Sequence, residues 1–116
     1  MHPRTRSHDP HDVHVKTLIA GGEALTAAIV QKWRPHCDRF INAYGPTETT
    51  VSVSKYYCDG GATDDPPIGV PIANMAFYLL DPFRRLVPLG AVGELYVGGP
   101  GVARGYIGNP AKTCEV

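Results

Sequence analysis

The sequence of 116 residues has no excess of charge of either sign, because 11 lysines and arginines balance 11 aspartates and glutamates. A basic excess is what attracts nucleic acid or an anionic membrane, so we expect neither as a partner. The sequence also has no apolar run near the length of a spanning helix and no basic-then-apolar leader. We therefore expect a cytoplasmic protein without a membrane segment.

Cysteine is scarce, and its spacing excludes the usual cysteine frameworks. The three cysteines are Cys37, Cys58 and Cys114, an odd number without a C-x-x-C pair. This pattern favours free thiols in a reducing cytosol over a disulfide-bonded fold.

Residues 1–12 are polar and show no hydrophobic periodicity, which predicts a disordered tail. His8, His11 and His14 recur every three residues, so a metal site must be weighed. Pro10 disfavours a helix here, and no cysteine or acidic cluster completes a ligand shell. A solvated tail is the favoured interpretation.

The first half of the remaining chain shows a strand–helix–strand pattern. Residues 13–20 are rich in β-branched residues and predict a buried strand that ends at Gly21-Gly22. Thr26 is a plausible N-cap for a helix whose core-facing stripe includes Ile29 and Trp33 and which Pro35 ends. A strand at 39–42 would then complete the βαβ unit of an α/β domain.

The second half predicts short strands separated by turns. We expect strands at 49–57, 73–81 and 93–97, with a structureless loop over 59–66 that contains Gly, Asp and Pro. The fold class is therefore α/β: a fragment of a layered βαβ subdomain over residues 13–58, followed by a small β-rich subdomain over 67–110.

The segment 41–51, I-N-A-Y-G-P-T-E-T-T-V, concentrates the residues that can carry chemistry. The Asn42 amide suits the edge of a base and Tyr44 offers a face for stacking. Gly45-Pro46 turns the chain sharply. Thr47 can bond a phosphate oxygen, and Glu48 is an oxygen ligand of the kind that holds Mg²⁺. A plain strand–turn–strand with a surface glutamate would use the same residue types. The residue types alone therefore leave open both a nucleotide-binding loop and a purely structural turn.

Four ordered segments resemble adenylation domains of nonribosomal peptide synthetases, within the superfamily of adenylate-forming enzymes. Asn42 to Glu48 is similar to the family signature N-x-Y-G-P-T-E. The other three segments are L-I-A-G-G-E-A-L at 18–25, P-I-G-V-P-I-A-N at 67–74 and G-E-L-Y-V-G-G-P-G-V-A-R-G-Y at 93–106. Four motifs in the right order are far more specific than one.

The resemblance implies a ligase that reacts an amino acid with ATP and Mg²⁺ to give aminoacyl-AMP, then loads it onto the phosphopantetheine thiol of a carrier protein. It implies that Thr47 and Glu48 are catalytic, with Glu48 as the Mg²⁺ ligand. It implies a nucleotide-binding set of Gly21, Gly22, Asn42, Tyr44, Gly45 and Thr47. It also implies an amino-acid pocket lined by Ile19, Gly21, Ala43, Val51 and Ser52.

Much of the family's machinery has no counterpart in residues 1–116, including the upstream phosphate loop and the C-terminal subdomain with its lysine. Residues 111–116 also depart from the family's usual continuation. We therefore expect an internal fragment that is inactive alone. A fragment of an acyl-CoA or aryl-acid ligase, or a non-enzymatic remnant, are the alternatives.

Overall fold

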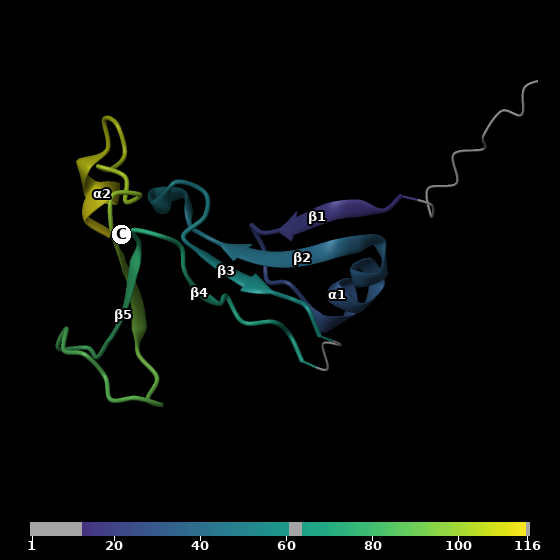
Figure 1. The fold of residues 1–116 in the computed structure, drawn as a ribbon. Coiled ribbons are helices and arrows are strands. Elements are labelled where there is room, and N and C mark those ends of the chain that lie inside the picture. The colour runs from purple at the N-terminus through teal and green to yellow at the C-terminus, as the bar shows by residue number, and fades with distance from the viewer. Residues whose placement is uncertain (1–12, 61–63, 116) are drawn as a thin grey trace, which may run out of the picture.

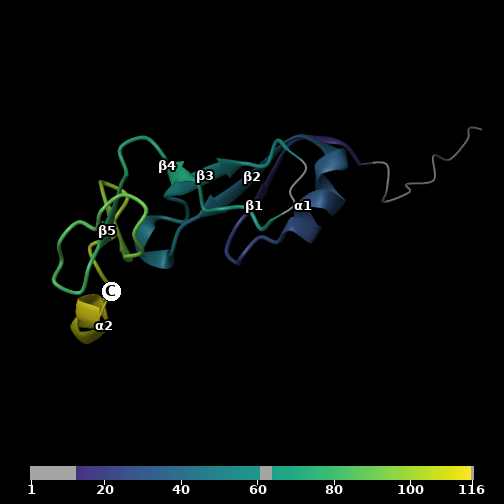
Figure 2. The same cartoon turned by 90° about the horizontal axis from the view of Figure 1, so that it is seen from below.

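The computed structural model describes residues 13–60 and 64–115, and the tail expected at 1–12, with His8 and His11, lies outside them. The described residues form two sheets, one of four strands and one of two (Figure 1). Both views place helix α1 (Ala27–Trp33) at one end of the molecule and the two-stranded sheet at the other (Figure 2). The coarse prediction of a mixed α/β fold is confirmed.

The four-stranded sheet begins with the predicted βαβ unit. Strand β1 (Val15–Ala20) leads through α1 to β2 (Cys37–Tyr44), which pairs with β1 in parallel. The second strand is longer than the predicted 39–42, because β2 is paired on both sides. Strand β3 (Ser54–Tyr57) lies antiparallel to β2, and the short β4 (Val70–Pro71) closes the order β1-β2-β3-β4.

Helix α1 begins where the sequence predicts, at the Thr26 N-cap, whose hydroxyl oxygen accepts a hydrogen bond from the Ile29 amide at 3.4 Å. The predicted stripe is wrong. Ile29 and Trp33 are 42% and 45% exposed, whereas Val30 is 1% exposed and faces the sheet. The helix has only seven residues and covers the sheet from one side, so a narrow stripe suffices. A 3₁₀ turn (Arg34–His36) containing Pro35 then leads into β2.

The core lies between α1 and one face of β1 and β2. Phe40 is its largest fully buried side chain. The cluster also contains Leu25, Val30, Cys37 and Cys58, with Val15, Leu18 and Ala20 packed against it. The prediction that residues 13–20 form a strand is confirmed, but the predicted burial is wrong, because every residue of β1 is half-buried or exposed. Ile19, which points to the other face, is 64% exposed.

The predicted strand 49–57 is wrong in its first half. Thr47–Thr49 form a 3₁₀ turn, and Thr50 and Val51 have φ of 56° and 70°. Extended backbone cannot contain two such residues, because strands require negative φ. The strand therefore starts at Ser54, after the chain has turned back on itself.

The second sheet pairs β5 (Ala76–Leu80) with β6 (Glu94–Gly98) in an antiparallel register that places Tyr78 opposite Tyr96. These are the two strands predicted at 73–81 and 93–97. The last described element is the short helix α2 (Pro110–Glu115), which lies beside the end of this sheet in Figures 1 and 2. The sequence analysis did not predict this helix, although Asn109 before Pro110 is an N-cap pattern, and Asn109 Oδ1 accepts from the Lys112 amide at 3.1 Å.

We expect Phe40→Ala to destabilise residues 1–116 by about 3–5 kcal/mol, because it removes the largest side chain of a small core and leaves a cavity. Urea unfolding followed by the fluorescence of the single tryptophan, Trp33, measures this. Ile107→Ala is the control, because Ile107 is fully exposed. Equal loss in both variants would contradict the position assigned to the core.

Candidate functional site

The end of β2 presents different side chains to the two faces of the sheet. Successive side chains of a strand point to opposite faces. Asn42 pairs with Ala20 and therefore lies on the helix-covered face, together with Tyr44. Ile41 pairs with Ile19, and Ala43 pairs with Lys55, on the uncovered face. The segment predicted to be chemically important thus faces two separate cavities.

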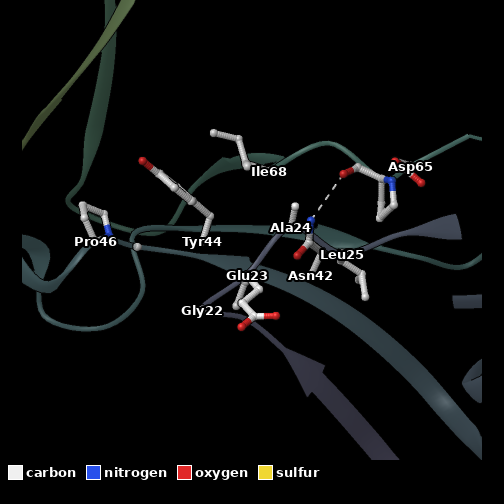
Figure 3. A pocket seen from close by; sticks show the side chains of 12 residues that line it. Gly22, Glu23, Ala24, Leu25, Asn42, Tyr44, Pro46, Asp65 and Ile68 are labelled. Carbon is white, nitrogen blue, oxygen red and sulfur yellow. Dashed lines mark hydrogen bonds between the residues drawn. The ribbon is translucent and has the colours of Figure 1, made fainter. Parts of the chain in front are cut away.

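The first cavity, of about 460 Å³, lies on the helix-covered face. It brings together four of the predicted nucleotide-binding residues: Gly22, Asn42, Tyr44 and Gly45. Figure 3 shows Tyr44 and Asn42 side by side along the wall, with Ile68 above them. Sequence reasoning missed the rest of the lining, which is Glu23, Ala24, Leu25, Ala43, Pro46, Asp65, Pro66 and Ile68.

Asn42 is 5% exposed, and its amide group is held in a fixed orientation. Its Nδ2 donates to the carbonyl oxygen of Pro67 at 2.9 Å and to that of Pro66 at 3.4 Å. The dashed line in Figure 3 marks the bond to Pro66. A carbonyl oxygen only accepts, so a flipped amide would set oxygen against oxygen. The loop predicted to be structureless over 59–66 therefore ends as one wall of the cavity. The Asp65 carboxylate Oδ1 also accepts from the Ala27 amide at 2.8 Å, which ties the loop to α1.

The second cavity, of about 680 Å³, lies on the uncovered face. All five residues predicted for the amino-acid pocket line it: Ile19, Gly21, Ala43, Val51 and Ser52. They come from β1, β2 and the turn that precedes β3, and the structure brings them together across more than thirty residues of chain. Thr47, Gly22, Gly45, Ile41, Lys55 and Ile72 complete the lining.

Gly22, Ala43 and Gly45 line both cavities, so little more than backbone separates them. A Cβ on Gly21 would lie 2.7 Å from the Ala43 carbonyl oxygen, which shows how closely the two strand ends approach. Gly45 is equally constrained, because its Cβ would lie 2.5 Å from the Val51 carbonyl oxygen. These glycines are required by the close backbone contact.

Lys55 is the charged residue of this lining, and sequence reasoning did not include it in the pocket. The antiparallel register pairs it with Ala43, which places both side chains on the uncovered face. Its Nζ lies 5.5 Å from the centre of the Tyr57 ring, and Tyr57 does not line the cavity. Its alternation with Ser54 and Tyr56 along the strand could have indicated that Lys55 lies on the opposite face from them, but its pairing partner Ala43 was not evident from sequence.

Glu48 lines neither cavity and turns instead towards the segment that follows β6. Its Oε1 accepts a hydrogen bond from the Tyr106 hydroxyl, and its carbonyl oxygen accepts from the Ala103 amide at 2.7 Å. The bond from Tyr106 is the main reason that the pKa of Glu48 lies below its usual value, and the same bond raises the pKa of Tyr106. Glu48 is therefore ionised at neutral pH, as a Mg²⁺ ligand must be.

Among the described residues, the other ionisable groups add no metal site. His14, the described member of the histidine series, bonds through Nε2 to the Asp38 carboxylate at 2.7 Å. Within residues 13–60 and 64–115, no three or more His, Cys, Asp or Glu side chains gather in a way that could hold a metal ion. No helix in the same ranges is long and apolar enough to cross a membrane.

The two cavities at one strand end, with an ionised carboxylate beside them, fit a protein that binds a nucleotide and a second small molecule. Residues 2–107 match the family described as AMP-binding enzyme, and the chain belongs to this family.

Its curated relatives include several peptide synthetases. The chain is 56% identical over 108 residues to malpibaldin synthetase of Mortierella alpina, a match that covers 87% of the chain and 2% of that protein. It is 42% identical over 108 residues to a dimodular nonribosomal peptide synthase of Bacillus subtilis, covering 92% of the chain and 4% of that protein. The chain therefore corresponds to a small part of such proteins, within an adenylation domain.

Solved structures of related proteins share the fold. A four-domain nonribosomal peptide synthetase bound to AMP and glycine superposes with a TM-score of 0.73 at 41% identity, covering 84% of this chain and 7% of that one. The N-terminal subdomain of Klebsiella oxytoca NpsA, solved with 3-hydroxybenzoyl-AMSN, superposes with a TM-score of 0.74 at 22% identity, covering 86% of this chain and 26% of that one. The latter shows a shared fold alone.

We expect Gly45→Ala to destabilise the chain by about 1–3 kcal/mol, because the new methyl group would clash with backbone atoms of Val51 and Ser52. Gly60→Ala is the matched control, since a Cβ there meets nothing within 4 Å. Urea unfolding of both variants measures the difference. A Gly45→Ala variant as stable as Gly60→Ala would show that the loop is not closed as described.

Proposed function

We propose that this chain forms the centre of an adenylation site that activates an amino acid with ATP and Mg²⁺ and passes the acyl group to the phosphopantetheine thiol of a carrier protein. One observation carries the proposal. Four of the six residues that the resemblance implies for the nucleotide line the helix-side cavity, and all five implied for the amino acid line the cavity on the uncovered face. The other two nucleotide residues, Gly21 and Thr47, line only the second cavity, and both cavities share the end of β2. The solved relative was bound to one nucleotide and one amino acid, AMP and glycine.

In this proposal the helix-side cavity holds the adenine. Tyr44 offers a ring face, and the fixed amide of Asn42 directs its oxygen away from the Pro66 and Pro67 carbonyls. An acceptor suits an amino group on a base. The uncovered face holds the amino-acid side chain, and the residues shared by both cavities lie where the substrate carboxylate would meet the α-phosphate.

The residues fit a Mg²⁺-bound nucleotide by the chemistry of their donors. Thr47 lies at the edge of the amino-acid cavity with a hydroxyl that can bond a phosphate oxygen. Glu48, next to it, is ionised and half-buried. When bound, Mg²⁺ would neutralise charge on the phosphates. The protein's contribution would be to position the reactants and to stabilise the charge that develops on the α-phosphate.

A hybrid protein tests this function. Residues 13–110 replace the matching segment of a complete adenylation domain, and amino-acid-dependent ATP–pyrophosphate exchange is measured. We expect exchange that falls on the order of a hundred-fold or more with Glu48→Gln, because a preorganised electrostatic contact is lost. Glu94→Gln is the control, since Glu94 lies on β6 and lines neither cavity. A folded hybrid whose exchange is indifferent to Glu48→Gln would refute the proposal.

The same hybrid tests the substrate class, which we predict to be a neutral amino acid, apolar or aromatic. None of the five implied pocket residues is charged, and Lys55 is the one charge in the lining of their cavity. A cationic side chain buried there would have no partner, at a cost of several kcal/mol, and an anionic one would depend on Lys55 alone. Exchange is compared across the twenty amino acids. A preference for lysine would contradict the prediction. A preference for glutamate that Lys55→Met abolishes would contradict it too and would assign the selectivity to Lys55.

Residues 1–116 produced alone should show no amino-acid-dependent exchange and at best millimolar binding of adenine nucleotides. The chain offers one Mg²⁺ ligand and one phosphate contact. By the family resemblance, three further electrostatic contacts lie outside it, and each is worth on the order of a hundred-fold in rate. The exchange assay is run with the chain and with Glu48→Gln. Exchange above background that the substitution removes would contradict the prediction.

A further inference from the structure

Glu48 is held by a segment far away in the sequence, which the adenylation proposal does not use. The segment 99–106 follows β6 and returns to the end of the first sheet. Its Ala103 amide donates to the Glu48 carbonyl oxygen at 2.7 Å, and its Gly101 carbonyl accepts from the Thr50 hydroxyl at 2.7 Å. The Tyr106 hydroxyl adds the bond to Oε1 of the Glu48 carboxylate. Backbone and side chain of Glu48 are thus fixed by one segment.

Tyr106 is itself fixed in place, so its hydroxyl is a preorganised donor. Its backbone amide donates to the Thr113 hydroxyl oxygen at 2.9 Å, on helix α2. The Lys112 ammonium lies 4.2 Å from the centre of its ring, a distance at which a cation is attracted to the ring face. Gly105 allows this approach, since a Cβ there would lie 2.4 Å from the Thr113 methyl carbon.

We propose that Tyr106 is a positioning residue for Glu48: its hydroxyl holds Oε1 of the carboxylate and directs Oε2 towards a divalent cation. The proposal rests on the proposed function, in which Glu48 is the Mg²⁺ ligand. A ligand carboxylate that is held by a hydrogen bond loses less rotational freedom when the metal binds, and such outer contacts commonly change metal affinity by about 10-fold to 100-fold.

A competing arrangement predicts the opposite change in metal affinity when the Tyr106 hydroxyl is removed. If the Tyr106 hydroxyl blocked the carboxylate, a cation would have to displace it, and removing the hydroxyl would strengthen metal binding. The direction of the change therefore distinguishes positioning from competition.

The test uses ¹⁵N-labelled residues 1–116 with Mn²⁺ alone as the probe, because Mn²⁺ broadens the amide signals of residues close to it even when it binds weakly. The signals of Thr47 to Thr50 report binding at Glu48. In Tyr106→Phe we expect half-maximal broadening of these signals to need about 10-fold more Mn²⁺. In Glu48→Gln we expect the local broadening to disappear.

The matched control is Tyr96→Phe. Tyr96 also donates its hydroxyl to a nearby carboxylate, that of Glu94 at 3.2 Å, but this pair lies on β6 away from Glu48. We expect Tyr96→Phe to leave the broadening of Thr47 to Thr50 unchanged. Hydrogen exchange of the Ala103 amide, which donates to Glu48, shows whether the segment stays docked in Tyr106→Phe.

If Tyr106→Phe loses the protection of Ala103, Thr113→Val decides, because it removes the anchor of the Tyr106 amide and keeps the hydroxyl. Weaker Mn²⁺ binding in Thr113→Val then supports positioning, and unchanged or tighter binding overturns it.

The proposed metal ligand and the proposed positioning residue are overturned by different outcomes. If the parent chain shows no broadening, or if the broadening persists in Glu48→Gln, Glu48 is not the metal ligand. The positioning role of Tyr106 is then overturned as well. If Glu48→Gln removes the broadening but Tyr106→Phe does not weaken it, only the positioning role of Tyr106 is overturned.

Discussion

The parallel pairing of β1 with β2, covered on one face by α1, is the constraint on which the other features depend. It fixes Leu18 opposite Phe40 and therefore decides which face holds the core. Because side chains alternate along a strand, the same register sends Asn42 and Tyr44 to one face and Ala43 to the other. A shift by one residue would exchange the two cavities and expose Phe40.

The close approach of backbone segments at the ends of β1 and β2 allows the two cavities to lie next to each other. Gly21 and Gly45 let the ends of β1 and β2 and the turn before β3 meet without intervening side chains. Two cavities can then share a thin backbone wall. The left-handed Thr50 and Val51 belong to the same arrangement, because they turn the chain so that Val51 and Ser52 reach the cavity on the uncovered face.

The second sheet contributes through one contact region rather than through a shared core. The segment after β6 contacts Glu48 and Thr50 by hydrogen bonds, and helix α2 supports Tyr106 from behind. A carboxylate in the 3₁₀ turn between β2 and β3 thereby accepts a hydrogen bond from a residue 58 positions later.

The sequence by itself determined what depends on local chemistry and on ordered motifs. It predicted the βαβ unit, the Thr26 cap, the two later strands and the membership in the AMP-binding family, because caps, alternation and short motifs are local signals. Tertiary structure alone decided which helix residue is buried, where β3 begins, how Pro66 and Pro67 fix Asn42, and that Tyr106 contacts Glu48. Each of these depends on strand register or on contacts between distant segments. Strand register and long-range contacts produce no periodic pattern in a single sequence. The stabilising energy comes from pairs of residues that are distant in the sequence, and neither residue of a pair indicates its partner.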